Sequence, residues 1–502
     1  MKTNKSILSM AFVVGATLAI TSCSTNLEEQ FKNITLTQGY KPQTEHNPIA
    51  TQRFGADPYA MEYNGRVYVY MTNDILVKDE NGNYKENDFK TINKIFCVSS
   101  EDLVNWTDHG PMQIAGVDGP AKWATFSWAP SVCHKTIDGK EKFFLYFANS
   151  GNGIGVVTSD NPYGPWTDPI GKEIVSRQTP TCDSIGVTWL FDPAVLIDDN
   201  GDGYLYVGGG IPFVKGKGPQ FADPGTARVV KLDASFTALD GDPVKINPPY
   251  MFEDAGANKI GDTYYYSYCT NFNSPELGNG CIAYMTSKNP MGPFEFQRVF
   301  FKSIDTFWGI GGNNHHAMLK FNDKYYLFYH SQVLQQAMGI DHGGYRCTHV
   351  DEVNIDENGV IQDVTGTKTG FEQLKAFNPF NLTEAETMAW MAGIDTKYEE
   401  NSNNMYVTSI SAGDWIGLSG VDFEDGASKF SAIVSNSADT SCAIKICIDK
   451  VDGDCIGYLE VKKSDGKFVE YSSNLNKTIT GKHDLFFIFS GEFEFDKWQF
   501  AK

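Results

Sequence analysis

One short pattern recurs five times between residues 57 and 375, and it constrains the fold more than any other feature of the chain. Each copy starts at an acidic, aromatic or histidine residue, enters an apolar strand, turns at Asn, Asp or Gly, and returns as an aromatic strand. The clearest copy runs from Asp192 through a strand over 194–197 and a turn over 198–203 to a strand over 204–207. Such a pattern predicts a β-hairpin.

The copies keep an almost constant period. They start at positions 57, 129, 192, 253 and 315, so successive starts lie 72, 63, 61 and 62 residues apart. Small antiparallel sheets at a fixed period are typical of a β-propeller, and five copies predict five blades. Because equivalent strands of a propeller line one central channel, the residues that head the copies should converge there. These residues are Asp57, Trp128, Asp192, Glu253 and His315.

The rest of the chain divides around this repeat region. Helical periodicity is nearly absent, so the chain is predicted to be all-β, with the five-bladed propeller over 46–377. Beyond a boundary near Asn378-Pro379 the pattern changes to short strands, for example over 429–434, 443–448, 456–461 and 484–488. We predict that residues 378–502 form a β-sandwich of jelly-roll type.

The N-terminus has the pattern of a bacterial lipoprotein signal. Two lysines precede a mainly apolar run over 7–20, and small residues stand before Cys23. The run is too short to favour a spanning helix. We therefore predict a signal peptide over 1–22, lipid attachment at Cys23, and a polar linker over 23–45. The protein would be exported and anchored at the cell envelope, on either side of an outer membrane; an ordinary secretory signal is the alternative.

Composition excludes several classes of function. Asp and Glu number 62 against 41 Lys and Arg, a net charge of −21, which argues against a nucleic-acid partner and is compatible with a neutral polysaccharide. No phosphate-binding loop, Gly-x-Ser-x-Gly elbow or His-Glu-x-x-His motif occurs, and no organic cofactor is expected. The cysteines lack zinc-site spacing and mostly predict buried thiols, although Cys269 and Cys281 leave a disulfide open.

Three of the residues that head copies are carboxylates in apolar or aromatic surroundings: Asp57, Asp192 and Glu253. Buried acids are unfavourable and acids that converge repel one another, so such sets are usually kept for function. Glycoside hydrolysis needs this chemistry, because one carboxylic acid protonates the leaving oxygen while a carboxylate activates water or attacks. A third acid can adjust the pKa of the proton donor.

The segments 56–58, 128–132, 191–194, 252–255 and 312–318 resemble glycoside hydrolase family 43. That family consists of five-bladed propellers that invert configuration. The resemblance implies that Asp57 is the general base, Glu253 the general acid, and Asp192 the residue that orients Glu253 and tunes its pKa. In an inverting site the acid and the base should lie ~6.5–9.5 Å apart.

The same resemblance implies further roles. His315 matches a channel histidine that often contacts a calcium or sodium ion through water, and His316 and Arg346 match substrate-binding positions. Trp128 and Phe126 would stack on the sugar, with core packing as the alternative, and Asp74 would be a substrate-side acid or a strand cap.

The segments 313–316 and 265–268 favour the xylan-acting branch of the family. We expect removal of α-L-arabinofuranosyl side chains from arabinoxylan. An exo-β-1,4-xylosidase and a non-catalytic glycan-binding surface lipoprotein are the alternatives. A fructan-acting propeller ranks lower, because the first copy begins Gly-Ala-Asp-Pro instead of Asn-Asp-Pro.

The C-terminal region resembles carbohydrate-binding module family 6 through segments such as 378–381, 413–416, 483–485 and 498–500. By that resemblance Glu384, Glu386 and Asp496 hold a structural calcium ion. Glu494 stands where the family's sugar-binding Asn is expected, so the region either binds sugar or serves as a packing module.

Overall fold

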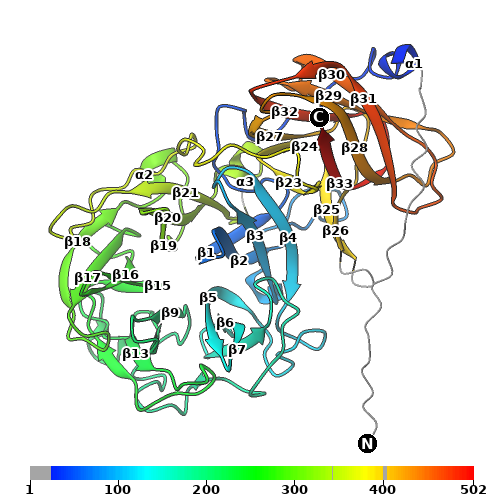
Figure 1. Ribbon diagram of the computed structural model, residues 1–502. Coiled ribbons are helices and arrows are strands. Elements are labelled where there is room, and N and C mark those ends of the chain that lie inside the picture. Colours follow the sequence, from blue (N-terminus) through cyan, green and yellow to red (C-terminus); the bar gives the residue numbers. More distant parts are fainter. Residues whose placement is uncertain (1–23, 342, 400–403) are drawn as a thin grey trace, which may run out of the picture.

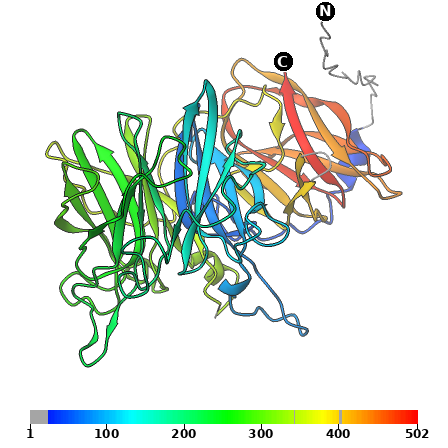
Figure 2. The same cartoon turned by 90° about the horizontal axis from the view of Figure 1, so that it is seen from below.

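The computed structural model describes residues 24–341, 343–399 and 404–502. A ring of five small sheets stands beside a two-sheet sandwich, as Figures 1 and 2 show in two views. Helices are confined to short segments in the described part of the chain: α1 (Ser24–Glu29), α2 (Asp305–Trp308), α3 (Val333–Ala337) and one 3-10 turn (Phe89–Thr91). The predicted all-β fold, a propeller followed by a sandwich, is confirmed.

Each blade is an antiparallel sheet whose strands follow one another in the sequence. The first blade contains β1 (Phe54–Tyr63), β2 (Arg66–Asp74), β3 (Lys94–Ser100) and β4 (Trp106–Gln113), and the second contains β5 (Trp128–Ile137), β6 (Lys140–Ala148), β7 (Gly153–Ser159) and β8 (Val175–Ser176). The third blade contains β9 (Ala194–Ile197), β10 (Gly203–Val207), β13 (Ala227–Lys231) and β14 (Val244–Ile246), and the fourth contains β15 (Met251–Ile260), β16 (Thr263–Thr270), β17 (Ile282–Ser287) and β18 (Glu295–Phe301). The fifth blade contains β19 (His316–Phe321), β20 (Lys324–Ser331) and β21 (Cys347–Val353). A separate hairpin, β11 (Phe213–Val214) and β12 (Gly218–Pro219), interrupts the third blade.

The ring closes between its first and last blades. The inner strands β1, β5, β9, β15 and β19 contact one another in turn, and β19 contacts β1. Chain that precedes the first blade fastens the last one: the Asn47 side chain donates to the Val350 carbonyl at 2.9 Å and accepts from the Val350 N–H at 2.9 Å. The Ile49 N–H donates to the Thr348 carbonyl at 2.9 Å. Residues 47–49 thus join the two ends of the propeller.

The C-terminal region is a sandwich of two sheets around one apolar core, as predicted. One sheet has the order β25 (Asp395–Glu399), β26 (Asn404–Thr408), β33 (Glu494–Ala501), β28 (Ala427–Ser435) and β31 (Val469–Ile479), with β22 (Thr383–Glu384) beside β33. The other has the order β24 (Trp390–Ala392), β27 (Trp415–Asp422), β32 (Lys482–Phe489), β29 (Cys442–Ile448) and β30 (Asp454–Val461). Phe430, Phe487 and Trp498 fill the space between the sheets.

The two domains share a sheet. Strand β23 (Thr387–Met388), from the start of the sandwich, pairs with β4 and becomes the fifth strand of the first blade. Beside it lies Asp108, which is fully buried and accepts from the Thr396 hydroxyl at 2.6 Å and from the Gln52 amide at 3.1 Å. Because a buried charge is stable only when it is paired and hydrogen-bonded, these contacts fix how the domains meet.

The prediction that residues 23–45 form a polar linker is corrected by the structure of residues 24–45, which pack on the sandwich. Residues 24–29 form α1, Leu27 is buried, and Phe31 packs on Tyr458 with ring centroids 5.8 Å apart. The Thr37 hydroxyl donates to Asp414 at 2.6 Å. The few apolar residues among the polar ones attach this segment to the sandwich, because each buries apolar surface there.

The predicted signal peptide over 1–22 and lipid site at Cys23 lie outside the described residues. No helix in the described ranges is long and apolar enough to cross a membrane. A disulfide between Cys269 and Cys281 was an open alternative in the sequence, and both are free, buried thiols.

Candidate active site

A pocket of about 450 Å³ opens where the inner strands begin, and all five residues that head the repeats line it. Asp57 lies near the start of β1, Trp128 begins β5, Asp192 precedes β9, Glu253 lies near the start of β15, and His315 precedes β19. The predicted convergence of these residues is confirmed. Each blade therefore contributes at least one side chain to a single site.

The backbone at these positions departs from a regular strand. Asp57 and Asp192 have positive φ values of 48° and 47°, which non-glycine residues rarely adopt. The pairing of β1 with β2 shifts between Ala56 and Tyr59, and that of β15 with β16 shifts on both sides of Glu253. Bulges re-aim side chains out of a ladder, and here they occur where β1 and β15 deliver Asp57 and Glu253 to the pocket.

Asp57 is the ionised carboxylate of the site. Burial alone would raise its pKa, but Arg346, whose Nη1 donates to Asp57 Oδ1 at 2.7 Å, brings the pKa well below its usual range. The Asp57 N–H donates to His330 Nδ1 at 3.1 Å, which fixes the backbone from the neighbouring blade. A buried carboxylate that stays charged can accept a proton from water, as the role of general base requires.

Arg346 is held by Asp74 as well as by Asp57. Its Nη2 and Nε donate to the two oxygens of Asp74 at 2.8 and 3.0 Å, and its backbone N–H donates to Asp74 at 3.0 Å. Asp74 is buried and does not line the pocket. The prediction that Asp74 contacts substrate is corrected: it orients Arg346, which does line the pocket.

Glu253 and Asp192 have pKa values displaced in the opposite direction from that of Asp57. Burial raises the pKa of Glu253 to about 8, opposed by Asn313 and reinforced by the charge of Asp57. Burial, then Glu253, then Asp57 raise the pKa of Asp192 well above its usual range. Divergent pKa values among neighbouring carboxyl groups mark the acid and the base of a hydrolytic site. Glu253 is thus protonated near neutral pH, as a general acid must be.

His315 lies among the carboxylates. Its Nδ1 is 3.6 Å from Asp57 Oδ1 and 3.9 Å from Asp192 Oδ2, and its Nε2 is 3.3 Å from Asp254 Oδ1. Burial lowers its pKa, against the nearby carboxylates that raise it. The imidazole therefore connects acids from three blades. The ion expected beside His315 stays a prediction.

Asp254 is a residue that the sequence pattern did not single out. It is fully buried, and its N–H donates to Asp192 Oδ2 at 3.0 Å. Its carboxylate binds His316 twice, at 2.5 Å from Nδ1 and 3.0 Å from the backbone N–H. The adjacency of Asp254 to Glu253 was the available signal, but strand alternation alone would place two successive residues on opposite faces.

The predicted role of His316 in substrate binding is also corrected. It is buried, it does not line the pocket, and its Nε2 is 2.7 Å from the Ser267 hydroxyl. Both ring nitrogens are therefore engaged, and the predicted substrate contact is replaced by a positioning role behind Asp254. A chain of hydrogen bonds runs from Ser267 through His316 and Asp254 to Asp192.

Aromatic side chains form the outer wall of the pocket. Trp128 lines it, and its Nε1 donates to the Phe89 carbonyl at 3.2 Å. Phe126 contacts Trp128 at 5.2 Å between ring centroids and supports it, and its stacking on sugar stays a prediction. Sequence reasoning missed Phe89, Trp189 and Phe272, which line the pocket and remain 46, 37 and 49% exposed. They lie outside the repeat heads, Phe89 in the 3-10 turn and the other two between strands, where periodicity carries no signal.

The predicted calcium ligands of the sandwich are only partly brought together. Glu386 is buried, and one carboxylate oxygen has no hydrogen-bond partner; burial and then Glu384 raise its pKa well above the usual range. Glu384 pairs with Lys497 at 2.6 Å, while Asp496 accepts from Asn404 at 2.8 Å. Among the described residues, no three or more His, Cys, Asp or Glu side chains group as a metal site. Glu386 and Glu384 have the oxygen donors that calcium prefers.

Comparison with known proteins identifies both parts of the chain. Residues 45–361 match the family model for glycosyl hydrolases family 43, and residues 384–502 match that for carbohydrate binding module family 6. An arabinoxylan arabinofuranohydrolase from Bacillus subtilis (strain 168) is 45% identical over 478 residues, covering 91% of this chain and 92% of the relative. One from Paenibacillus polymyxa is 45% identical over 476 residues, covering 91% of this chain and 74% of the relative.

A solved structure supports the same family assignment. The crystal structure of a family 43 arabinoxylan arabinofuranohydrolase from Bacillus subtilis, in complex with cellotetraose, matches with a TM-score of 0.88 and 44% identity. The match covers 93% of this chain and 99% of that structure. The likeness therefore includes both domains.

Asp254→Asn tests the hydrogen-bond chain behind the acids. The charge of Asp254 contributes to the raised pKa of Glu253, after burial and Asp57. Removing that charge should lower this pKa, so the alkaline limb of kcat/KM for glycoside hydrolysis should move to lower pH, with kcat falling about tenfold or more. Asp351→Asn, at a buried Asp bound to Tyr329 and outside the pocket, is the matched control and should leave the pH profile unchanged. An unmoved alkaline limb in Asp254→Asn would contradict this role.

Proposed function

The chain belongs to glycosyl hydrolase family 43, and from that premise we propose that it removes α-L-arabinofuranosyl side chains from arabinoxylan with inversion of configuration. One observation carries the mechanism: a buried ionised carboxylate and a buried protonated carboxyl group line the same pocket. That pair is what an inverting glycosidase needs, with one group to activate water and the other to protonate the leaving oxygen.

Each of these residues has a separate role in hydrolysis. Asp57, kept charged by Arg346, takes a proton from the attacking water. Glu253 donates its proton to the oxygen of the departing polysaccharide. Asp192 would orient Glu253. The imidazole of His315 lies 3.6 Å from Asp57 and 3.9 Å from Asp192, and burial and then the charge of Glu253 raise the pKa of Asp192. Once Glu253 has donated and Asp57 has accepted a proton, exchange with solvent restores the starting state.

The shape of the pocket supports a substrate that is a branch on a longer chain. A volume of about 450 Å³ lies at the lower end of the usual range for ligand pockets. Exposed aromatic faces at Phe89, Trp189 and Phe272 surround the acids and offer apolar surface to further sugars. The names of the relatives over most of the chain support arabinoxylan as the polymer.

An exo-β-1,4-xylosidase is the second candidate. A relative named beta-xylosidase from Xylanibacter ruminicola is 25% identical over 346 residues and covers 62% of this chain. Both activities use the same pair of carboxyl groups, so the sugar that the pocket accepts distinguishes them. A non-catalytic glycan-binding role is disfavoured, because binding alone does not require acids with opposed pKa shifts.

Product analysis decides between these activities. The protein is incubated with wheat arabinoxylan and, separately, with linear xylobiose, and the released sugars are identified by chromatography. We expect arabinose from the polymer and no xylose from xylobiose. Xylose from xylobiose would assign the chain to the xylosidases, and no sugar from either would reject both activities.

Glu253→Gln separates the acid from the base. An aryl arabinofuranoside with an activated leaving group needs no proton donor, whereas arabinoxylan does. The variant should therefore lose about 10²–10⁴-fold in kcat on arabinoxylan but much less on the aryl glycoside. The alkaline limb, which we expect near the Glu253 pKa of about 8 in the parent enzyme, should disappear on the aryl substrate.

Asp57→Asn is the matched control, because it replaces the other carboxylate by its amide. It should abolish hydrolysis of both substrates, since attack by water is required in each, while sugar binding persists. Equal losses on both substrates in Glu253→Gln would contradict its assignment as the acid.

We also propose a structural calcium ion in the sandwich, held by Glu386 and Glu384. The support is the buried Glu386 oxygen without a partner and the second carboxylate beside it. When bound, the ion would supply charge compensation for these acids and fix the segment around β22. Glu384 would exchange its ion pair with Lys497 for the ion, and Asp496 would join them only if its bond from Asn404 were exchanged.

Calcium added to chelator-treated protein should raise Tm by several degrees, because a ligand that binds only the folded state stabilises it. Glu386→Gln should abolish this increase, whereas Glu424→Gln, at an exposed acid paired with Lys502, should retain it. A calcium-dependent increase in Tm that survives Glu386→Gln would contradict the site.

Lipid attachment at Cys23 and a place at the cell envelope are proposed on the pattern of residues 1–23 alone. Fractionation of cells that express the full chain tests this, since the protein should sediment with membranes and Cys23→Ala should release it.

A further inference from the structure

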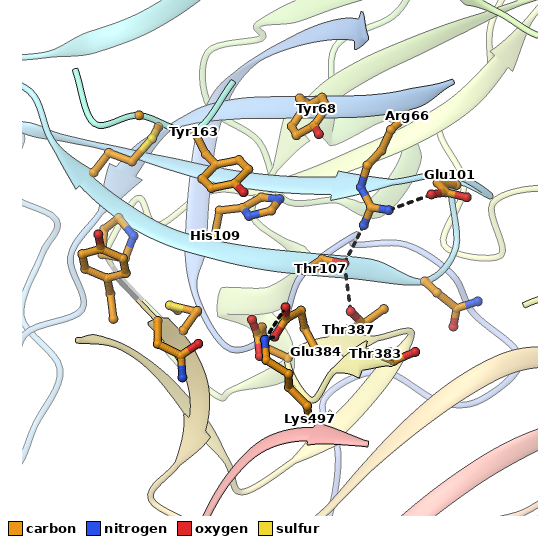
Figure 3. A pocket seen from close by; sticks show the side chains of 18 of the residues that line it. Arg66, Tyr68, Glu101, Thr107, His109, Tyr163, Thr383, Glu384, Thr387 and Lys497 are labelled. Carbon is orange, nitrogen blue, oxygen red and sulfur yellow. Dashed lines mark hydrogen bonds and ion pairs between the residues drawn. The ribbon is translucent and has the colours of Figure 1, made fainter. Parts of the chain in front are cut away.

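A second cavity lies between the propeller and the sandwich. It measures about 1210 Å³ and shares no lining residue with the catalytic pocket. One wall comes from the first blade and the loop that carries Tyr163, and the other comes from β22, β25 and β33 of the sandwich. Figure 3 shows Tyr163 and His109 on the first wall, across from Glu384 and Lys497 on the second. We refer to this space as the interdomain cleft.

The walls of the interdomain cleft are fixed before any ligand arrives. Strand β23 pairs with β4 beside the cleft, and the buried Asp108 on β4 accepts from Thr396 at 2.6 Å. Gly110 on β4 approaches Met405 so closely that a Cβ there would lie 3.1 Å from the methionine methyl carbon. Preformed walls lower the entropy cost of binding an extended ligand.

Three stacked rings form the propeller wall. The rings of Tyr68 and His109 lie 5.9 Å apart, and those of His109 and Tyr163 lie 4.3 Å apart and almost parallel, at 6°. Burial lowers the pKa of His109 to about 3, so the imidazole is neutral. The outermost ring, Tyr163, remains 45% exposed at the cleft. The stack is thus an uncharged aromatic platform with its last face toward solvent.

The loop that carries Tyr163 has a twin in the fourth blade. Residues 161–166 read Asn-Pro-Tyr-Gly-Pro-Trp after β7, and residues 289–294 read Asn-Pro-Met-Gly-Pro-Phe after β17. A tyrosine hydroxyl anchors each loop through its first proline carbonyl: Tyr70 at 2.6 Å in one, and Tyr206 at 2.8 Å in the other. The same turn therefore forms with either Tyr or Met at its third position.

The two loops differ in what this third residue does. Met291 is half-buried and packs against the apolar core between blades, as a loop residue usually does. Tyr163 instead stacks on His109 and presents its ring to the cleft. The loop does not need an aromatic residue there to fold, and the exposed ring is available to a ligand in the cleft.

The opposite wall offers hydrogen-bonding groups of both kinds. Glu384 and Lys497 form an ion pair whose side chains remain 42 and 24% exposed. Tyr398 on β25 adds a further aromatic side chain to the lining. Carboxylate oxygens and ammonium hydrogens together can pair with groups that both donate and accept, such as sugar hydroxyls.

We propose that the interdomain cleft binds the main chain of a neutral polysaccharide, outside the active site. Sugar rings present C–H faces that an aromatic platform buries and hydroxyl edges that the polar wall hydrogen-bonds. A net charge of −21 disfavours an anionic polymer. This inference rests on the proposed function for the identity of the polymer, arabinoxylan, but not on its chemistry of cleavage.

The test compares binding by full-length variants in an Asp57→Asn background, which leaves the polymer intact. Affinity electrophoresis through gels that contain soluble arabinoxylan or debranched xylan gives the dissociation constant. We expect Tyr163→Met, which copies the twin loop, to bind both polymers about threefold to tenfold more weakly. Tyr163→Phe keeps the ring and should bind as the parent does. Trp128→Ala, in the same background, measures the contribution of the catalytic pocket separately.

The small substrate provides the second readout. With Asp57 restored, Tyr163→Met should hydrolyse an aryl arabinofuranoside with unchanged kcat/KM, because that substrate does not extend beyond the catalytic pocket. Unchanged polymer binding in Tyr163→Met would overturn the proposal. So would a monomer–dimer equilibrium that Tyr163→Met abolishes, since the cleft would then hold a second copy. Failure of the parent enzyme to cleave the aryl arabinofuranoside would reject the arabinofuranosidase activity, while the binding comparison would still decide the cleft.

Discussion

The ion pair between Arg346 and Asp57 is the interaction on which the rest of the active site depends. Asp57, Asp192 and Glu253 line one pocket, and of these only Asp57 is in direct contact with the guanidinium. That contact holds Asp57 ionised, and its fixed negative charge then helps to raise the pKa of the other two. One buried cation thereby divides chemically similar groups into a base and an acid.

The closed ring is what allows this charge arrangement to exist. Asp57 comes from the first blade and Arg346 from chain just before the last strand of the fifth, so their contact spans the closure of the propeller. Asn47 and Val350 hold the same closure through reciprocal hydrogen bonds. Burial of three carboxyl groups in one pocket is unfavourable, and the bonds around the closure offset this cost. Fold and site are therefore coupled through the same two blades.

The repeat period was enough to predict the blades and the residues that meet at their centre. Each copy places the same strand at the same radius, so Asp57, Trp128, Asp192, Glu253 and His315 could be found without coordinates. Asp254 could not, because its inward direction depends on a bulge, and a bulge breaks the alternation on which a sequence argument relies. Phe89 and Trp189 were not predicted as pocket residues for a related reason. The segments that carry them lack periodicity, so nothing in the sequence indicates which way their side chains face.

The N-terminal segment and the domain junction show a different limit of sequence reasoning. Residues 24–45 are mostly polar, yet Leu27 and Phe31 attach them to the sandwich, because a few apolar contacts outweigh average composition. Pairing of β23 with β4 is set by backbone groups, which every residue carries, so it leaves almost no trace in the side chains.

The shared strand has a consequence for how two sites on one molecule act on a polymer. If a flexible linker joined the domains, the sandwich would move relative to the propeller, and the gain in affinity from a second contact would fall as the linker lengthened. Here the paired strands and the buried Asp108 hold the cleft at a constant position relative to the pocket. A chain bound in the cleft would then be held at a fixed position relative to the acids. Binding along the polymer and cleavage at a branch can thus change independently, because the first depends on loop residues such as Tyr163 and the second on carboxyl groups that the closed ring brings together.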